Sequence, residues 1–190
     1  MKKAATYAVL ALASLITLAP VIWTVLSSMR PPAESLSADG SFIPSSLDFS
    51  SYPAVFGEVD MWMLTLNSVL VTGIIAVGQM LSAAMAGYVF ARFEFHGKNL
   101  LFALILATMM VPMQVTIVPV FMLIRGMNLA DTLLALILPA IPTAFGTFLM
   151  RQYFLGLPAE LGEAAEIDGA GPWRIFASIY APLAMPGMAI

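Results

Sequence analysis

The stretch that decides the fold lies at residues 163–171, which read Glu-Ala-Ala-Glu-Ile-Asp-Gly-Ala-Gly. It follows Pro158, a residue that a first helical turn tolerates because its missing N–H would be unpaired there anyway. Glu160 and the first residue of the stretch place negative charge near the positive end of a helix dipole. The alanines favour helix, and Gly169 can adopt the left-handed conformation that ends one. We predict a short helix whose exposed side carries little bulk, so that a second chain can approach it closely.

The sequence around this stretch is strongly apolar. Of its 190 residues, 61% are hydrophobic and only 10% are charged, against roughly 25% charged residues in an average soluble domain. Long uncharged runs of this kind indicate an integral, all-α membrane protein. The net charge of −3 gives no reason to expect nucleic-acid binding, and a chain with no cysteine and one histidine lacks the usual ligands of a metal site. We expect no cofactor and no catalytic residues.

Four uncharged runs are long enough to cross a bilayer, which takes roughly 20 residues. A cleaved signal peptide is the alternative for the first run, but its core would be shorter, at about 7–15 residues. We therefore expect an uncleaved first helix. The expected spans are 5–27, 63–90, 100–124 and 132–150.

A fifth uncharged run covers residues 175–190, but it is too short to cross and Pro182 and Pro186 are expected to divide it. Between the first two spans, a proline-rich polar segment separates a first part, 1–60, from a transmembrane core, 61–190. That segment is expected to be an external loop with aromatic anchors.

The third span contains two prolines with polar residues between them. Pro112 and Pro119 free backbone carbonyls and bend the helix, while Gln114 and Thr116 add polar side chains at the same depth. One interpretation is a bend that lines a translocation path. The other is a static kink whose polar groups are satisfied by neighbouring helices, and the residues alone leave both open.

Basic residues indicate the orientation of the chain. With the N-terminus inside, the inner segments hold six basic residues and the outer segments hold two, Arg30 and Arg125. This asymmetry satisfies the positive-inside rule and places residues 163–171 in the cytoplasm. The six inner residues are Lys2, Lys3, Arg92, Lys98, Arg151 and Arg174.

The four spans contain no Asp, Glu, Lys, Arg or His. Ion-driven carriers and pumps commonly place such groups at membrane depth, so their absence argues against ion coupling. Gly97 and Lys98 do not form a phosphate-binding loop either, since Arg92 stands where the first glycine is needed and Asn99 replaces Ser or Thr. Any energy for transport should therefore come from a separate subunit.

These residues also resemble a known family. Glu163–Ala165, Asp168–Ala170, Ile179 and Ala181–Leu183 are similar to the "EAA" loop of ABC-importer permeases, above all those of the carbohydrate type. The resemblance extends over roughly residues 5–190. It implies a polytopic helical bundle with the type I ABC importer permease fold, and a coupling loop at about 155–182. Relatives normally have about six spans, so the sequence is expected to stop within the fifth helix, as a fragment or a truncated product.

The resemblance implies a function as well. It suggests a permease subunit that lies in the bacterial cytoplasmic membrane and imports a sugar or sugar-like solute. It also implies that the N-terminus lies in the cytoplasm. The implied partners are a second permease subunit, two cytoplasmic ATPase subunits, an external solute-binding protein and the lipid bilayer. The residues expected to dock on the ATPase are Glu163, Ala164, Ala165, Asp168 and Gly169. A passive channel or structural membrane subunit without an ATPase is the alternative.

Overall fold

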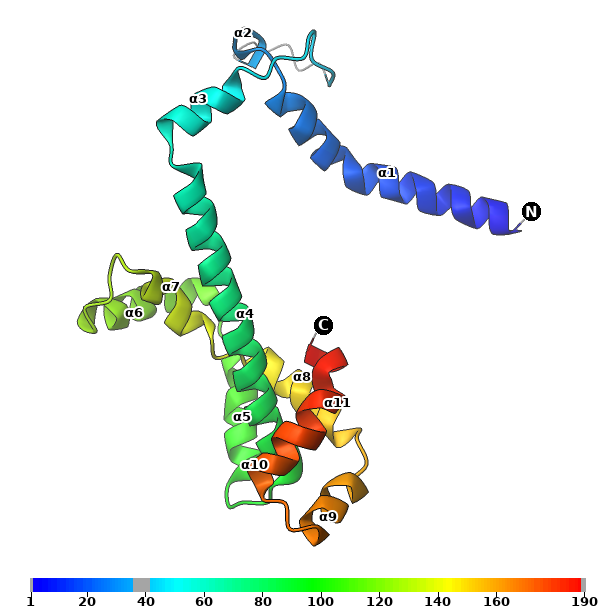
Figure 1. Cartoon of the computed structure of the whole chain (residues 1–190), viewed down its shortest axis with the longest axis vertical. Coiled ribbons are helices and arrows are strands. Elements are labelled where there is room, and N and C mark those ends of the chain that lie inside the picture. The colour runs from blue at the N-terminus through cyan, green and yellow to red at the C-terminus, as the bar shows by residue number, and fades with distance from the viewer. Residues whose placement is uncertain (1, 36–41, 189–190) are drawn as a thin grey trace. The chain divides into compact units, whose positions relative to one another are not determined.

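The computed structural model describes residues 2–35 and 42–188, and every regular element in this part of the chain is helical (Figure 1). The helices divide into two compact units, Met1–Thr65 and Leu66–Ile190. Each unit is described by itself.

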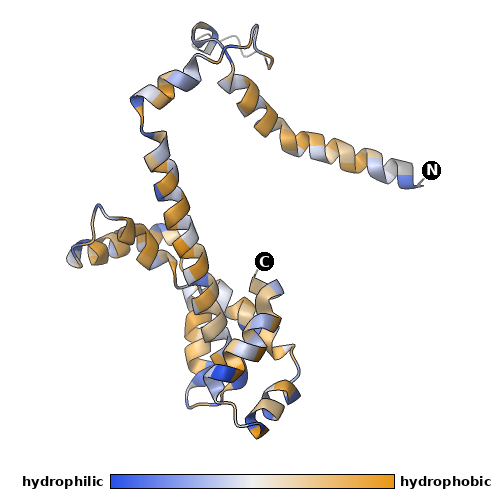
Figure 2. Ribbon diagram, in the orientation of Figure 1, coloured by the Kyte–Doolittle hydropathy of each residue, from blue (hydrophilic) through white to orange (hydrophobic). Residues whose placement is uncertain are grey.

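The first unit consists of one long helix and two short ones. Helix α1 covers Lys2–Ser28, one turn or less beyond the predicted span, and α2 and α3 cover Pro32–Ser35 and Ser51–Glu58. The ribbon of α1 is mostly orange in Figure 2, because apolar residues occupy nearly all of its length. Its described large side chains are exposed within this chain except that of Leu26, which is half-buried, so the surface of α1 is suited to lipid or to another subunit.

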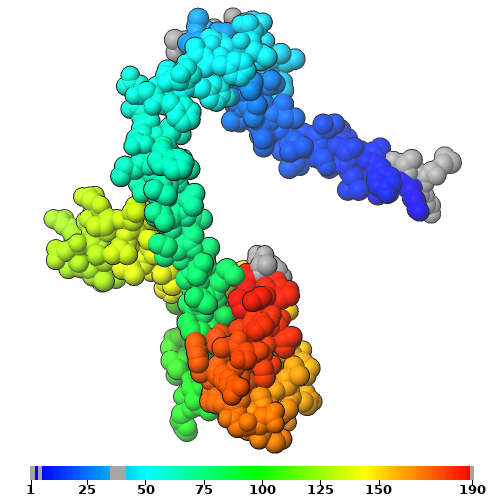
Figure 3. All heavy atoms as spheres, viewed as in Figure 1, coloured from blue at the N-terminus to red at the C-terminus, as the bar shows by residue number. Residues whose placement is uncertain are grey.

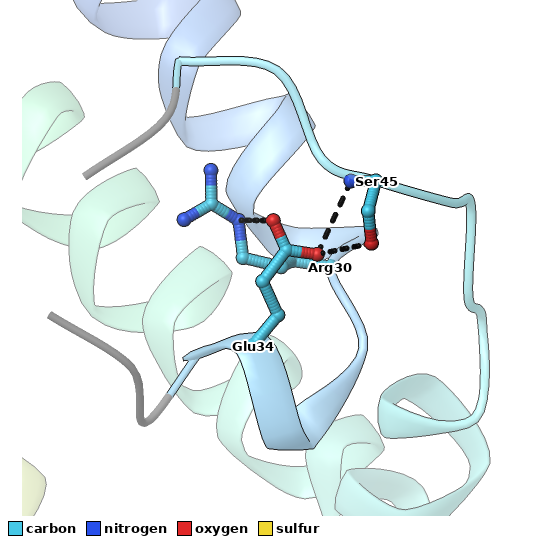
Figure 4. A network of polar contacts seen from close by, with 3 residues as sticks. All are labelled: Arg30, Glu34 and Ser45. Atoms are coloured by element: carbon cyan, nitrogen blue, oxygen red, sulfur yellow. Dashed lines mark hydrogen bonds and ion pairs between the residues drawn. The ribbon is translucent and has the colours of Figure 1, made fainter. Parts of the chain in front are cut away.

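Polar contacts fasten the proline-rich segment to the end of α1. The guanidinium Nε of Arg30 lies 3.7 Å from a carboxylate oxygen of Glu34. The other oxygen of Glu34 accepts hydrogen bonds from the N–H and the hydroxyl of Ser45, at 3.2 and 2.8 Å (Figure 4). Ser28 and Tyr52 share a further hydrogen bond of 2.7 Å between their hydroxyls. The described parts of the predicted loop are therefore held to the end of α1 by these contacts.

The second long helix, α4, covers Met61–Arg92, two residues more at each end than predicted. Its buried residues all belong to its last third, where Ala83, Ala84 and Gly87 let another helix approach. A Cβ atom on Gly87 would lie 2.6 Å from the Cβ of Met150 and 2.8 Å from the backbone nitrogen of Arg151. The small-residue stripe of α4 is thus a packing surface for α8.

The next two predicted spans are each broken into a pair of helices. Helices α5 (Lys98–Thr108) and α6 (Met113–Gly126) meet at 102°, and α7 (Leu133–Ala140) and α8 (Ala144–Leu155) meet at 42°. The first break is far sharper than the proline kink expected there. Pro112 does not kink a continuous helix: it has an extended backbone (φ −66°, ψ 138°) and stands just before α6.

The C-terminal segment is helical without interruption from residue 172 to residue 188. It comprises α10 (Pro172–Ile175), a π-helical turn η1 (Phe176–Tyr180) and α11 (Ala181–Met188). The prediction that Pro182 and Pro186 divide this run is therefore wrong. Local π-helical adjustment is one way in which apolar helices accommodate proline, because it re-pairs the backbone groups that the ring leaves free.

The core of the second unit forms where α4, α8, η1 and α11 meet. Its centre is aromatic: the ring of Tyr88 lies 5.7 Å from that of Phe154, 5.1 Å from Phe176 and 5.3 Å from Tyr180, between centroids. Figure 3 shows the orange and red atoms of this C-terminal region closely packed together. The buried residues of the cluster are Ala83, Ala84, Tyr88, Met150, Phe154, Ile175, Phe176, Tyr180 and Ala184.

Within the described residues, two helical segments are long and apolar enough to cross a membrane, Thr6–Ser28 and Met61–Arg92. The count rises to four if each bent pair forms one span. The four spans predicted from the sequence correspond to that larger count.

Candidate functional site

The decisive stretch forms helix α9, which covers Glu160–Ile167, with Ala159 before its first turn. Glu160 and Glu163 lie in that turn, at the positive end of the helix dipole. Pro158 lies one residue before the position that caps the helix, so it does not take part in the first turn as predicted. The helix axis therefore starts two residues later than the sequence suggests.

The end of α9 is a glycine-dependent cap. The N–H of Gly169 donates to the carbonyl of Glu166 at 3.0 Å, and the N–H of Ala170 donates to the carbonyl of Ala165 at 2.9 Å. This pair of bonds is the Schellman motif, which needs a left-handed residue at its centre. Gly169 has φ +78°, so the predicted helix-ending role of this glycine is confirmed.

The two faces of α9 differ in character. Glu163, Ala164 and Glu166 are exposed on the outer face, and Ile167 has 87% of its surface exposed. Ala165 is half-buried and packs against the aromatic core instead. Ala164 thus keeps the outward position that the sequence predicts, whereas Ala165 contributes to the inward face.

The inner face of α9 rests on Tyr180. Gly162 is buried, and a Cβ atom added to it would lie 2.9 Å from the hydroxyl oxygen of Tyr180. The same hydroxyl donates to the carbonyl of Pro158 at 3.4 Å. Gly162 is therefore needed for close packing of the helix on this ring, a role that the sequence reasoning did not assign.

Arg92, the last residue of α4, reaches the same region. Its Nη2 donates to the carbonyls of Phe154 and Leu157, at 2.7 and 2.6 Å. These carbonyls lie at and just beyond the C-terminus of α8, the negative end of its dipole. Its guanidinium carbon lies 4.7 Å from the centre of the Tyr180 ring, within the range of a cation–π contact. Arg92 was predicted as an inner basic residue at the end of the second span, and no local signal in the sequence indicates these contacts.

A hollow of about 350 Å³ opens between the end of α4 and α9. Its lining brings the guanidinium of Arg92 together with acidic side chains from α9 and from the turn that follows α4. The charged lining residues are Arg92, Glu94, Glu163 and Glu166. Glu163 and Glu166 therefore border both the outer face of α9 and this hollow.

The residues predicted to line a translocation path lie elsewhere. Pro112 precedes α6, and Gln114 and Pro119 are exposed on that helix. The hydroxyl of Thr116 donates to the carbonyl of Met113 at 2.9 Å, a bond within the helix itself. None of these four residues borders α9, and their role in transport stays a prediction.

Polar side chains of α4 meet the break between α7 and α8. The amide nitrogen of Gln79 donates to the carbonyl of Ala140 at 2.7 Å, and the hydroxyl of Ser82 donates to that of Ile141 at 3.2 Å. Both carbonyls precede Pro142, which has no N–H to continue the helix. These contacts satisfy freed backbone groups, as expected for a static bend inside a bundle.

Comparison with known proteins gives a consistent result. Residues 79–190 match the family described as "Binding-protein-dependent transport system inner membrane component". The diacetylchitobiose uptake system permease protein NgcG of Streptomyces coelicolor is 37% identical over 188 residues, covering 98% of this chain and 62% of the relative. The arabinooligosaccharides transport system permease protein AraQ of Halalkalibacterium halodurans is also 37% identical, over 90% of this chain and 62% of the relative.

Two further matches extend the comparison. The sn-glycerol-3-phosphate transport system permease protein UgpE of Brucella suis is 33% identical, covering 95% of this chain and 67% of the relative. The crystal structure of a bacterial ABC transporter involved in the import of the acidic polysaccharide alginate contains a chain that matches with a TM-score of 0.82 and 26% identity, covering 98% of this chain and 66% of that one. The chain thus spans about 62% of the length of the first two relatives.

Proposed function

This chain belongs to the family of binding-protein-dependent transport system inner membrane components, and we propose that it is the permease subunit of an ABC importer for a sugar or sugar-like solute. The observation that carries the proposal is α9, an acidic helix that exposes Glu163, the small side chain of Ala164 and the apolar side chain of Ile167. Membership of the family supports the import of a solute. The saccharides in the names of NgcG and AraQ support the solute class.

In this proposal α9 is the coupling helix, which docks in a cleft of a cytoplasmic ATPase subunit. Glu163 pairs with a basic group of the ATPase, and Ala164 permits close approach. Gly169 and Asp168 complete the turn that ends the helix, while Ala165 holds the helix to the core. The exposed side chain of Ile167 supplies an apolar contact at the end of the same surface.

The distribution of basic residues supports the orientation in this proposal. An inside N-terminus puts six of the eight Lys and Arg residues on the cytoplasmic side. It also puts α9 on the side where ATP is available. The remaining partners in the proposal are a second permease subunit, a second ATPase subunit and an external solute-binding protein, all in or at the bacterial cytoplasmic membrane.

Transport by a reconstituted complex tests the function. The full chain would be purified with its cognate permease, ATPase and binding protein and placed in liposomes. Uptake of radiolabelled diacetylchitobiose, arabinooligosaccharide and lactose would then be measured, with sn-glycerol-3-phosphate as an anionic comparison. We expect ATP-dependent accumulation of at least one neutral saccharide. Equilibration without ATP would instead identify a passive channel and contradict the proposal.

Charge reversal on α9 tests the docking surface. We expect Glu163→Lys to lower the affinity of the ATPase for the membrane subunits by at least tenfold in detergent. Glu160→Lys is the matched control, because it reverses a charge in the same helical turn and so changes the interaction with the dipole to a similar extent. Equal effects of the two substitutions would contradict a specific role of Glu163.

The cap provides a second test of docking. We expect Gly169→Asp to abolish ATP-dependent uptake while insertion in the membrane persists, because a side chain is disfavoured at φ +78°. Wild-type uptake by this variant would refute the docking assignment.

A further inference from the structure

We propose that Arg92 and Tyr180 form a clasp that makes α9 move together with the membrane helices, and that they are positioning residues for energy coupling. We define the clasp as these two side chains and the three carbonyls that they bind, those of Phe154, Leu157 and Pro158. The inference rests on the proposed function of α9, and it concerns contacts that hold the segment just before that helix. The outer face, which would meet an ATPase, is not involved.

The clasp joins three segments that are far apart in the sequence. Arg92 ends α4 and Tyr180 ends the π turn η1. The carbonyl of Phe154 lies in the last turn of α8, and those of Leu157 and Pro158 lie in the connection from α8 to α9. Both hydrogens of Nη2 in Arg92 are used, because this one nitrogen lies 2.7 and 2.6 Å from two carbonyl oxygens. Movement of either carbonyl away from Arg92 therefore lengthens a hydrogen bond to this one nitrogen.

Tyr180 adds a second constraint from the opposite side. Its ring lies under the guanidinium of Arg92 at 4.7 Å, and its hydroxyl reaches the carbonyl of Pro158. The ring also fills the space left by the missing side chain of Gly162. The first turn of α9 therefore packs against the ring of Tyr180, which in turn contacts Arg92 at the end of α4.

The burial of the clasp makes it rigid. Tyr180 is buried in the aromatic core, where its ring lies 5.3 Å from that of Tyr88 on α4 and 6.2 Å from that of Phe154 on α8. Packed cores shift between discrete arrangements and do not deform continuously. A force on α9 is thus transmitted to α4 and η1 as one displacement.

Arg151 provides an internal comparison. Its Nε donates to the carbonyl of Phe90 at 3.1 Å and its guanidinium lies 4.4 Å from the ring centre of Phe102. It thus resembles Arg92 in chemistry, with a carbonyl and an aromatic ring as partners. Its contacts join α8 to α4 and α5, however, and do not reach α9. A purely structural role would make the two arginines equivalent.

The first experiment measures the clasp without any partner. Because the chain has no cysteine, Ile167→Cys and Val89→Cys provide one labelling site on α9 and one on α4. Double electron–electron resonance then reports the distance between two spin labels in the purified chain. We expect a narrow distribution with Arg92 intact and a distribution at least twice as broad in Arg92→Gln. An unchanged distribution would overturn the proposal.

The second experiment measures transmission in the complete transporter. We expect Arg92→Gln to lower uptake at least tenfold while the ATPase binds with an affinity within twofold of wild type. Arg92→Lys should recover part of the uptake, because it keeps the charge and one or more donors but not the planar stack on Tyr180. Arg125→Gln, an exposed arginine on α6, controls for the loss of one positive charge.

The outcomes separate this inference from the proposed function. Failure of the wild-type protein to bind the ATPase would refute the docking of α9 itself. Normal uptake in Arg92→Gln, with the ATPase bound, would refute only the clasp. Equal losses of uptake and of ATPase binding in Arg92→Gln and Arg151→Gln would show that both arginines merely maintain the fold, which also overturns the inference.

Discussion

Residues 1–65 and 66–190 are both rich in apolar side chains, yet they use them differently. In the first unit, Arg30 is the only buried residue among those described, with 9% of its surface exposed. The leucines and valines of α1 are exposed, apart from the half-buried Leu26. In the second unit, aromatic and small side chains from α4, α8 and η1 are packed into one core. Burial thus depends on whether neighbouring helices belong to the same chain. Where they do not, lipid or another subunit has to cover the apolar surface.

The difference predicts the largest effect for a core phenylalanine. Phe154 is fully buried at 0% exposure, so Phe154→Ala should lower the free energy of unfolding by about 3–5 kcal/mol. Phe56→Ala on α3, where the side chain is 66% exposed, should change it by less than about 0.5 kcal/mol. Denaturant titration in detergent micelles, followed by circular dichroism, measures both values. Similar losses for the two variants would remove the distinction between the units.

A smaller effect is expected at the contact between α4 and α8. Gly87→Ala places a Cβ atom 2.8 Å from the backbone nitrogen of Arg151, and overpacking of this kind typically costs about 1–3 kcal/mol. Gly73→Ala on the same helix is the matched control, because no atom lies within 4 Å of its Cβ position. We expect this control to be neutral or stabilising by up to about 1 kcal/mol. If Gly87→Ala were equally benign, the helices would have to approach less closely than described.

The cap of α9 should contribute somewhat less. Gly169→Ala introduces a side chain at φ +78°, at a cost of about 1–2 kcal/mol. Gly126→Ala is the control. Gly126 ends α6 without a positive φ, and no atom lies within 4 Å of its Cβ position, so this variant tests the loss of a glycine alone. Hydrogen exchange at the N–H groups of residues 169 and 170 should accelerate in the first variant only. Equal exchange rates in the wild type and Gly169→Ala would contradict the Schellman cap.

The smallest effect concerns the polar segment of the first unit. The N–H of Ser50 donates to the carboxylate of Asp48 at 2.8 Å, and this bond, with a contribution from the Ser50 side chain, lowers the pKa of Asp48. A lowered pKa stabilises the fold above the unfolded value of about 3.9, and this stabilisation is lost as the pH falls through the lowered pKa. Asp48→Asn should remove this acid-dependent component of unfolding. An unchanged acid titration in that variant would contradict the assignment.

Local patterns predicted the long helices well. The uncharged runs around α1 and α4 placed both helices within a few residues, and the glycine at position 169 correctly marked the end of α9. These features depend on apolar length and on backbone conformation, which a sequence shows directly.

Features that depend on packing were not predicted. The sequence showed that Ala164 and Ala165 are small but not that one faces outward and the other faces the core. Tyr180 and Gly162 gain their meaning only when η1 and α9 come together, because they are separated by 18 positions and by a turn. The continuity of residues 172–188 was missed because a π turn compensates for proline in a way that composition does not indicate.

The 102° bend between α5 and α6 has a consequence for the surrounding bilayer. At 1.5 Å per residue these helices measure roughly 16 and 21 Å, and a hydrocarbon layer of about 30 Å exceeds either one. Neither arm is long enough to cross such a layer alone, so the pair forms either a broken span or a re-entrant loop, with its bend at residues 109–112.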